Sequence, residues 1–254
     1  MKISLKKQAY SHIRSRIIHG SLVPGDRISH RDLAKDIGVS YTPIREAINQ
    51  LVEEGLVECH ARRGTFISSP RPEDVLEIAD IRAGIERQLM EKLAGHVSSG
   101  ALAEVRELNA QLRRIIADFE QTGGRLWVVE QARQWLFTNM GIHLTLLSEA
   151  GNRRAIKTII ELQLVTCGSG YLDQAPTLEG LLFAVDTHEK LFDALERGDA
   201  VAAGTVIKEH VEHDLLDAAK AARNGHFGKV RGWQSPKEGL APSVIRRMKE
   251  LEVD

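Results

Sequence analysis

Four polar side chains in the second half of the sequence have the types and spacing of metal ligands. Asn139 and His143 are four residues apart, so on a helix they share one face. His188 and His210 each lie in the middle of a later segment with helical periodicity. If these helices converge in a bundle, three imidazoles and one amide oxygen can bind a divalent transition metal with positions left open.

Each of these histidines also has a simpler explanation. A single buried histidine is more often a hydrogen-bonded core residue than a ligand. His213, one turn after His210, competes with it as the ligand. The three histidines that we expect at the surface are His12, His96 and His226.

A metal-dependent hydrolase is a competing function, because catalytic zinc sites also use three histidines and an open position. Such an enzyme needs a positioned base. Glu189 follows His188 directly, but consecutive residues of a helix point about 100° apart, and the sequence has no H-E-x-x-H motif. We therefore expect a protein that is not an enzyme.

A second group of polar residues, near the N-terminus, has the spacing of a DNA-binding helix-turn-helix. Ser40, Tyr41 and Thr42 follow the corner glycine Gly38 and open a helical segment. The free N–H groups and partial positive charge of a helix start can hold a phosphate. Arg45 projects from the same turn and can donate two hydrogen bonds to guanine. Ordinary surface charges on a small helical domain are the alternative.

A basic β-hairpin is expected just after this helix. Two strand-like segments, residues 56–59 and 65–67, are joined by a turn that contains Arg62, Arg63 and Gly64. A hairpin with a basic tip suits phosphate or minor-groove contact.

The elements that position these residues divide the chain into three parts. Helical periodicity predicts helices over residues 9–18, 31–37 and 42–54, and the proline-rich residues 68–72 read as a short linker. Six helical segments follow between Glu73 and about Asn224. We expect a mainly α protein: a winged helix-turn-helix in residues 1–69, an all-α antiparallel bundle of six or more helices in residues 70–224, and an extension, residues 225–254, that is a short helix or partly disordered.

Composition and charge agree with this division. The chain has 254 residues, 43% of them hydrophobic, and its net charge of −1 hides an asymmetry. Residues 1–69 hold 11 Lys and Arg against 7 Asp and Glu, which favours a nucleic-acid partner at that end. No apolar run is long enough to span a membrane and no secretory signal is visible, so we expect a cytoplasmic protein. Cys59 and Cys167 form no CxxC pair and indicate neither a disulfide nor a thiolate zinc site.

The stretch from Leu22 to Ile67 closely resembles the DNA-binding domain of the GntR superfamily of transcription regulators. The resemblance rests on the segments GSLVPGDRI, LAKDIGVSYTPIREAI, EEGLVE and RRGTFI. Tyr41 departs from the arginine of most relatives, so their operator sequences do not transfer. The DNA-contacting residues that the resemblance implies are Arg31, Ser40, Tyr41, Thr42 and Arg45, with Arg62, Arg63 and Gly64 in or beside the wing tip.

The second half resembles the FCD effector domain of the FadR-type subgroup. This rests on IHLTLLSEAGN, on DTHEKLFDALERGD, and on a histidine 22 residues after His188. The resemblance implies that Asn139, His143, His188 and His210 bind a divalent metal such as Zn, Ni or Mn. Asn139 stands where aspartate is commoner, which leaves the site one negative charge poorer. It also implies that Arg82, in an R-x-x-x-E helix, binds the carboxylate of a small organic acid; a surface pair with Glu86 is the alternative.

These features together predict a ligand-responsive regulator. We expect a homodimer on a palindromic double-stranded DNA operator, since two-fold protein symmetry imposes two-fold symmetry on the site. Repression relieved by a ligand is the commoner arrangement in such families. A metal-free bundle that binds an apolar or acyl effector remains an alternative.

Overall fold

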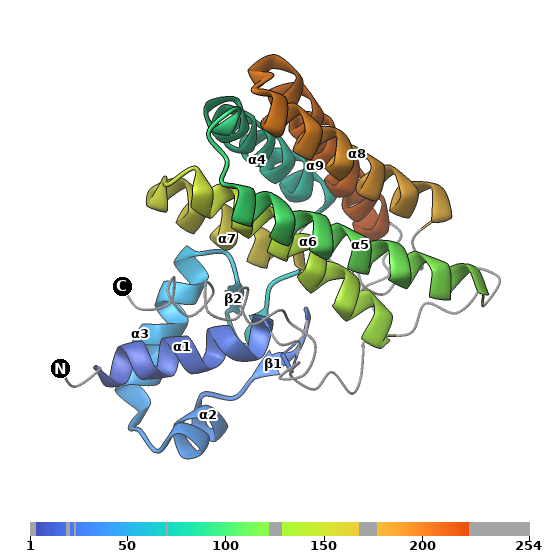
Figure 1. The fold of residues 1–254 in the computed structure, drawn as a ribbon. Helices are drawn as coiled ribbons and strands as arrows, with labels where there is room; N and C mark the ends of the chain where they lie inside the picture. The colour runs from blue at the N-terminus through green and yellow to red at the C-terminus, as the bar shows by residue number, and fades with distance from the viewer. Residues whose placement is uncertain are drawn as a thin grey trace.

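The structure, a computed structural model, describes residues 4–18, 21–22, 24–69, 71–121, 129–167 and 177–223. Within these residues the chain forms nine helices and one three-stranded sheet (Figure 1). The mainly α fold expected from the sequence is confirmed. The expected extension, residues 225–254, and His226 lie outside the described residues.

The N-terminal head contains three helices and the sheet. Ser29 caps α2 by accepting a hydrogen bond from the Asp32 backbone at 3.2 Å, and Gly38 ends it in the left-handed conformation with φ 75°. The head's core is aliphatic and centres on the fully buried Ile13, Ile44 and Leu51. Its elements are α1 (Leu5–Ile18), β1 (Arg27–Ile28), α2 (His30–Ile37), α3 (Tyr41–Glu53), β2 (Val57–His60) and β3 (Gly64–Ile67).

The wing has one strand more than the sequence indicates. The expected hairpin is present as β2 and β3, antiparallel, with Glu58 paired to Phe66. On the other edge of β3 lies β1, which pairs Arg27 with Phe66. A two-residue strand is too short to show an alternating pattern, so its position depends on the tertiary fold.

Six helices make the C-terminal bundle, as the sequence predicts. They are α4 (Pro72–Leu93), α5 (Ser99–Gln121), α6 (Val129–Glu149), α7 (Arg153–Cys167), α8 (Leu178–Arg197) and α9 (Ala200–Arg223). Helix α4 packs along α9, α9 along α8, and α5 against both α6 and α8. Pro72, expected in the linker, is instead the first residue of α4, where a missing N–H costs nothing. Among the described helices, none is long and apolar enough to cross a membrane.

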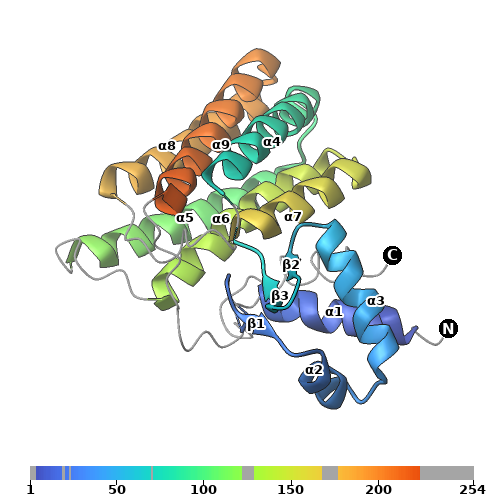
Figure 2. The ribbon, with the colours of Figure 1, turned by 180° about the vertical axis from the view of Figure 1, so that it is seen from behind.

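The corner after α4 touches the corner after α8 at the end of the bundle away from the head (Figures 1 and 2). Gly95 and Gly198 both have positive φ, 76° and 72°. The Gly95 N–H donates to the Leu195 carbonyl at 2.8 Å. A Cβ on Gly95 would lie 3.4 Å from the Cα of Gly198, so only small residues allow this approach.

Head and bundle meet through α7. Ile160 of α7 packs against both hydrophobic cores, and α1 contacts α7. Helix α7 in turn packs on α4 and α6. In Figures 1 and 2 the turn between α2 and α3 lies at the end of the head farthest from the bundle.

Candidate metal centre and nucleic-acid interface

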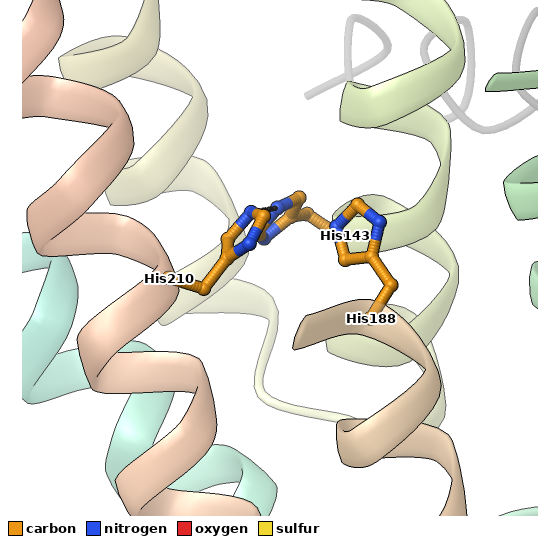
Figure 3. Close-up of side chains that lie close together, drawn as sticks. All are labelled: His143, His188 and His210. Carbon is orange, nitrogen blue, oxygen red and sulfur yellow. Dashed lines mark hydrogen bonds between the residues drawn. The ribbon is translucent and has the colours of Figure 1, made fainter. Parts of the chain in front are cut away.

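Three histidines from three helices converge inside the bundle (Figure 3). His143 of α6, His188 of α8 and His210 of α9 are 4%, 1% and 1% exposed. One nitrogen of each ring lies within 4.8 Å of the corresponding nitrogen of the other two. The His143 and His210 Nε2 atoms are 3.2 Å apart. These three predicted ligands are therefore together in space.

The orientation of His188 follows from its hydrogen bond to Asn109. The Asn109 Nδ2 donates to the Val185 carbonyl at 3.0 Å and to Glu189 Oε1 at 2.7 Å. Its Oδ1 must then accept from His188 Nδ1, 3.0 Å away. The Nε2 of His188 is left as a lone pair, and within the described part of the chain it has no hydrogen-bond partner although it is buried.

A buried carboxylate orients His143. Its Nδ1 lies 2.7 Å from Glu86 Oε2. The other oxygen of Glu86 accepts from Arg82 Nε and Nη2 at 3.0 and 2.8 Å. An ionised carboxylate only accepts, so Nδ1 of His143 is the donor and Nε2 faces the centre. A carboxylate behind the histidine is the usual companion of a metal-binding imidazole.

His210 is oriented by Thr187. The Thr187 Oγ1 has one hydrogen, which goes to the carbonyl of Phe183 or Ala184, at 2.8 and 2.9 Å. Its oxygen therefore accepts from His210 Nδ1 at 2.8 Å. In each of the three rings, Nδ1 donates outward and Nε2 is turned inward.

The surroundings of His188, His210 and Glu86 shift their pKa values in the direction that metal binding requires. Burial lowers the pKa of His188 well below its usual range, and the nearby His210 and His143 lower it further. Burial likewise lowers the pKa of His210 to about 4, against an opposing effect of Asp214. Burial alone would raise the pKa of Glu86, but Arg82 and His143 outweigh it and hold that pKa at about 2.

The donor set fits a divalent transition metal. The Nε2 atoms of His143 and His210, 3.2 Å apart, must share either one hydrogen or a metal cation, since two lone pairs that face each other repel. Two nitrogens on one ion at bond lengths of about 2.1 Å are about 3.0–3.4 Å apart. Neutral imidazoles are ligands for zinc, nickel and related ions. The three inward Nε2 atoms thus have the spacing and chemistry of a metal site, and that of His188 has no partner among the described residues.

Asn139 and Arg82, the other two residues predicted for this site, lie beside it. Asn139 is partly buried; its Nδ2 lies 3.4 Å from Asp214 Oδ2, and its Oδ1 is buried without a partner among the described residues. Arg82 does pair with Glu86, but the pair is buried, with Arg82 6% exposed, and is not the surface pair of the simpler alternative.

The competing residues have other contacts. His213 stacks on Phe183 with ring centroids 4.1 Å apart and is not part of the cluster. Glu189 accepts from Arg106 at 3.0 Å and from Asn109, so both its oxygens are used away from the Nε2 atoms. His12 and His96 are exposed, as expected.

Asn109 and Thr187 were missed by sequence reasoning, as was the role of Glu86. Thr187 precedes His188 in the sequence yet contacts His210, and Asn109 of α5 lies three helices earlier than its partner in α8. Residue spacing carries no signal for either contact, because both are made between helices. The R-x-x-x-E pattern located Glu86 but not its bond to His143.

The predicted DNA-contacting residues lie at the start of α2, at the start of α3 and in the wing. Ser40 is the residue before α3, and its side chain makes no capping hydrogen bond, so its hydroxyl is available. At the wing tip Arg62 and Gly64 have positive φ, 67° and 115°. The exposed members are Arg31, Ser40, Tyr41, Thr42, Arg45, Arg62 and Arg63, and Gly64 is partly buried.

Two further residues of the head belong with this surface. The Tyr41 hydroxyl lies 3.2 Å from His30 Nδ1, and His30 Nε2 lies 3.1 Å from Thr65 Oγ1. This chain of contacts ties the start of α3 to the wing. Arg27 of β1 lies against the wing tip: its Nε would be 3.1 Å from a Cβ on Gly64. Sequence reasoning missed Arg27 because β1 was not foreseen, and it missed His30 because both its contacts are with other elements.

Two family models match the chain. One, described as bacterial regulatory proteins of the gntR family, matches residues 5–67, and the FCD domain matches residues 77–213. An HTH-type transcriptional regulator in an unstable DNA locus of Streptomyces ambofaciens is 27% identical over 211 residues, 81% of this chain and 81% of that protein. The HTH-type transcriptional repressor RspR of Escherichia coli K12 is 24% identical over 210 residues, 82% of this chain and 86% of the repressor.

Solved structures share the fold. Escherichia coli McbR/YncC has a TM-score of 0.67 at 21% identity, over 86% of this chain and 99% of that chain. A GntR-type regulator from Rhodococcus sp. RHA1 has a TM-score of 0.63 at 22% identity, over 84% and 96%. At these identities the likeness extends to the fold alone.

Proposed function

The chain belongs to the GntR family of bacterial regulatory proteins and carries an FCD domain, and from this membership we propose that it is a homodimeric repressor controlled by a small carboxylate effector. It is a DNA-binding transcription regulator and not an enzyme. The proposal adds the repressor role, the palindromic operator, the class of effector and a divalent metal. The repressor role is supported by the relative RspR, which is described as a repressor.

DNA binding is assigned to the head, residues 1–69. The N–H groups at the start of α3 hold a backbone phosphate, and Arg45 reads a base edge in the major groove. Arg62 and Arg63 add contacts from the wing, and Arg31 adds one from α2. All four arginines are exposed, which supports this assignment.

Effector binding is assigned to the bundle, residues 70–224, and one observation supports it most: three Nε2 atoms turned toward one another, in rings whose Nδ1 atoms already donate to other side chains. His143, His188 and His210 would hold the ion, zinc, nickel or manganese, and Asn139 Oδ1, which lacks a partner among the described residues, would be a further oxygen. A bound ion would supply a positive centre with an open position for a carboxylate oxygen.

Arg82 is the second anchor for the effector in this proposal. Two of its nitrogens donate to Glu86, so the remaining guanidinium edge is the part that would meet a carboxylate. Its burial beside His143, through their common partner Glu86, keeps it next to the proposed metal.

Zinc and a panel of small carboxylic acids test the proposal. Full-length protein, stripped by a chelator and then reloaded or not with Zn²⁺, is titrated with duplexes selected from a random pool. We expect the selected duplexes to be inverted repeats. An acid that binds should raise the melting temperature of the protein. We expect such an acid to weaken the binding of the protein to DNA when Zn²⁺ is present, and to have no effect on DNA binding when Zn²⁺ is absent.

The His188→Ala variant is the matched control for this experiment. It should bind DNA as the wild type does and lose the response to the acid. An equal response in chelated wild-type protein would favour the alternative, a metal-free bundle with an apolar or acyl effector. Selected duplexes without two-fold symmetry would contradict the dimer on a palindrome.

A further inference from the structure

Asp214 lies at the edge of the histidine cluster. It follows His210 by one turn of α9, and its Oδ2 is 3.4 Å from His210 Nε2. The same oxygen is 3.4 Å from Asn139 Nδ2. The Asp214 side chain is 23% exposed, so it forms the boundary between the buried rings and solvent.

The geometry around His210 brings Asp214 into the cluster. His210 Nδ1 already donates to Thr187 Oγ1 at 2.8 Å, and its Nε2 lies 3.2 Å from His143 Nε2 as well as 3.4 Å from Asp214 Oδ2. The Nε2 of His210 thus has a second ring nitrogen and a carboxylate oxygen beside it, and all three are atoms that can bind a metal ion.

The side chain at position 139 is neutral, so a negative charge at the site has to come from another residue, such as Asp214. Asn139 brings no charge to the site, and its amide N–H groups point to Asp214 while its Oδ1 has no partner among the described residues. Three neutral imidazoles bind a divalent ion without offsetting its charge, whereas a carboxylate ligand offsets part of it.

We propose that Asp214 supplies the negatively charged oxygen ligand of the metal centre, held in place by the Asn139 amide, so that the charge absent from position 139 comes from α9 instead of α6. This inference rests on the proposed metal site of the three histidines. It adds a ligand that the spacing of the sequence did not indicate.

Zn²⁺ affinity and the Co²⁺ absorption spectrum of the chelator-stripped, full-length protein test the proposal. Asp214→Asn should lower Zn²⁺ affinity about tenfold or more in competition with a chromophoric chelator, and should alter the visible Co²⁺ bands. The double variant Asn139→Asp, Asp214→Asn moves the carboxylate back to α6 and should restore most of the affinity. Glu209→Gln removes the same charge from an exposed neighbour of His210 and should change neither readout.

The outcomes separate this inference from the proposed function. If the wild-type protein binds Zn²⁺ no better than His188→Ala, both the proposed metal site and the role of Asp214 are disproved. If wild type binds Zn²⁺ and Asp214→Asn binds equally well, only the inference is overturned. It is overturned also if affinity falls with an unchanged Co²⁺ spectrum, because Asp214 would then act by its charge and not as a ligand. Thermal unfolding of the metal-free variants checks that each is folded.

Discussion

The two nitrogens of each clustered histidine have different roles. Nδ1 donates to an oxygen of another side chain, and Nε2 faces the other two rings. Three different acceptors achieve this: a carboxylate for His143, an amide for His188 and a hydroxyl for His210. A substitution of any of these acceptors should therefore change the affinity of the proposed site for a metal, although no ligand is removed.

Glu86→Gln tests this most directly. We expect Zn²⁺ affinity to fall about 10–100-fold, because an amide no longer strengthens His143 as a ligand. The variant should also lose about 3–5 kcal/mol of unfolding free energy, since the buried Arg82 charge is left without its partner. Chelator competition and urea unfolding measure the two effects.

The double variant Arg82→Gln, Glu86→Gln separates the two effects of the Glu86 change. It removes both buried charges, so most of the stability should return while Zn²⁺ affinity stays low. Recovery of both together would show that the weakened metal binding was only a consequence of lost stability.

The acid stability of the metal-free protein follows from the same rings. The folded-state pKa of His210, about 4, is below its unfolded value of about 6.5, so as the pH falls the unfolded chain takes up the proton first. The unfolding free energy is therefore full above about pH 6.5 and declines toward pH 4. At pH 5 His210 alone accounts for a loss on the order of 2 kcal/mol.

Urea unfolding of chelated protein at pH 7 and pH 5 measures this loss. His210→Gln cannot take up the proton, so part of the pH dependence should disappear. An unchanged pH dependence in that variant would mean that other groups cause the acid sensitivity.

Spacing along the sequence could predict that the three histidines meet but not which side chains orient them. Each histidine lies in the middle of a helix, and helical periodicity places it on an inward face. Thr187, however, sits beside His188 and bonds to His210. The acceptors depend on how helices pack across the bundle, which local spacing does not encode.

At the scale of the helices, glycines set the ends that spacing could predict. Gly38 and Gly198 end α2 and α8 in the left-handed conformation, which favours glycine over other residues. One helix start was predicted wrongly. From the sequence, Pro72 is predicted to lie in the linker, whereas it is the first residue of α4. Strand β1 was missed because its two residues pair only through the wing.

Gly198→Ala should lower the unfolding free energy by about 1 kcal/mol, because an L side chain is strained at φ 72°. Gly84→Ala is the matched control. A Cβ added to Gly84, which lies within α4, would meet nothing within 4 Å, so alanine there should stabilise the protein by about 0.5–1 kcal/mol. Urea unfolding of both variants tests the difference in sign, and a stabilised Gly198→Ala would refute it.

At the scale of the whole molecule, the basic residues and the proposed metal site lie in different domains. The exposed arginines of the head belong to a part of the chain with a net positive charge, whereas the bundle and tail hold the excess of acidic residues. Affinity for DNA should therefore depend on salt, and metal loading should govern the stability of the bundle.

The salt dependence can be assigned to residues. Each phosphate contact contributes a slope of about −0.9 to the logarithm of affinity against the logarithm of salt concentration. Arg62→Ala and Arg63→Ala should each make the slope shallower by about that amount. Fluorescence anisotropy at several salt concentrations measures it, and Lys190→Ala, an exposed change on α8, should leave the slope unchanged.

Metal removal should lower the melting temperature of the wild-type protein. Zn²⁺ at about 100 times its dissociation constant adds about 2.7 kcal/mol. For a protein of this size that corresponds to a shift of about 5–10 °C. Differential scanning calorimetry with and without chelator measures the shift. His188→Ala should show none, and an equal shift in that variant would place the stabilising ion elsewhere.

The corners after α4 and α8 are in contact at Gly95 and Gly198, and this contact can act as a pivot for α4 at the end of the bundle remote from the head. Helix α4 runs from that point past Glu86 to Pro72, where the chain crosses to the head. At 1.5 Å per residue, Glu86 lies about 14 Å and Pro72 about 35 Å along this lever arm. If α4 swings as a rigid rod, a small displacement beside the histidines is magnified about 2.5 times at the point where the head is attached.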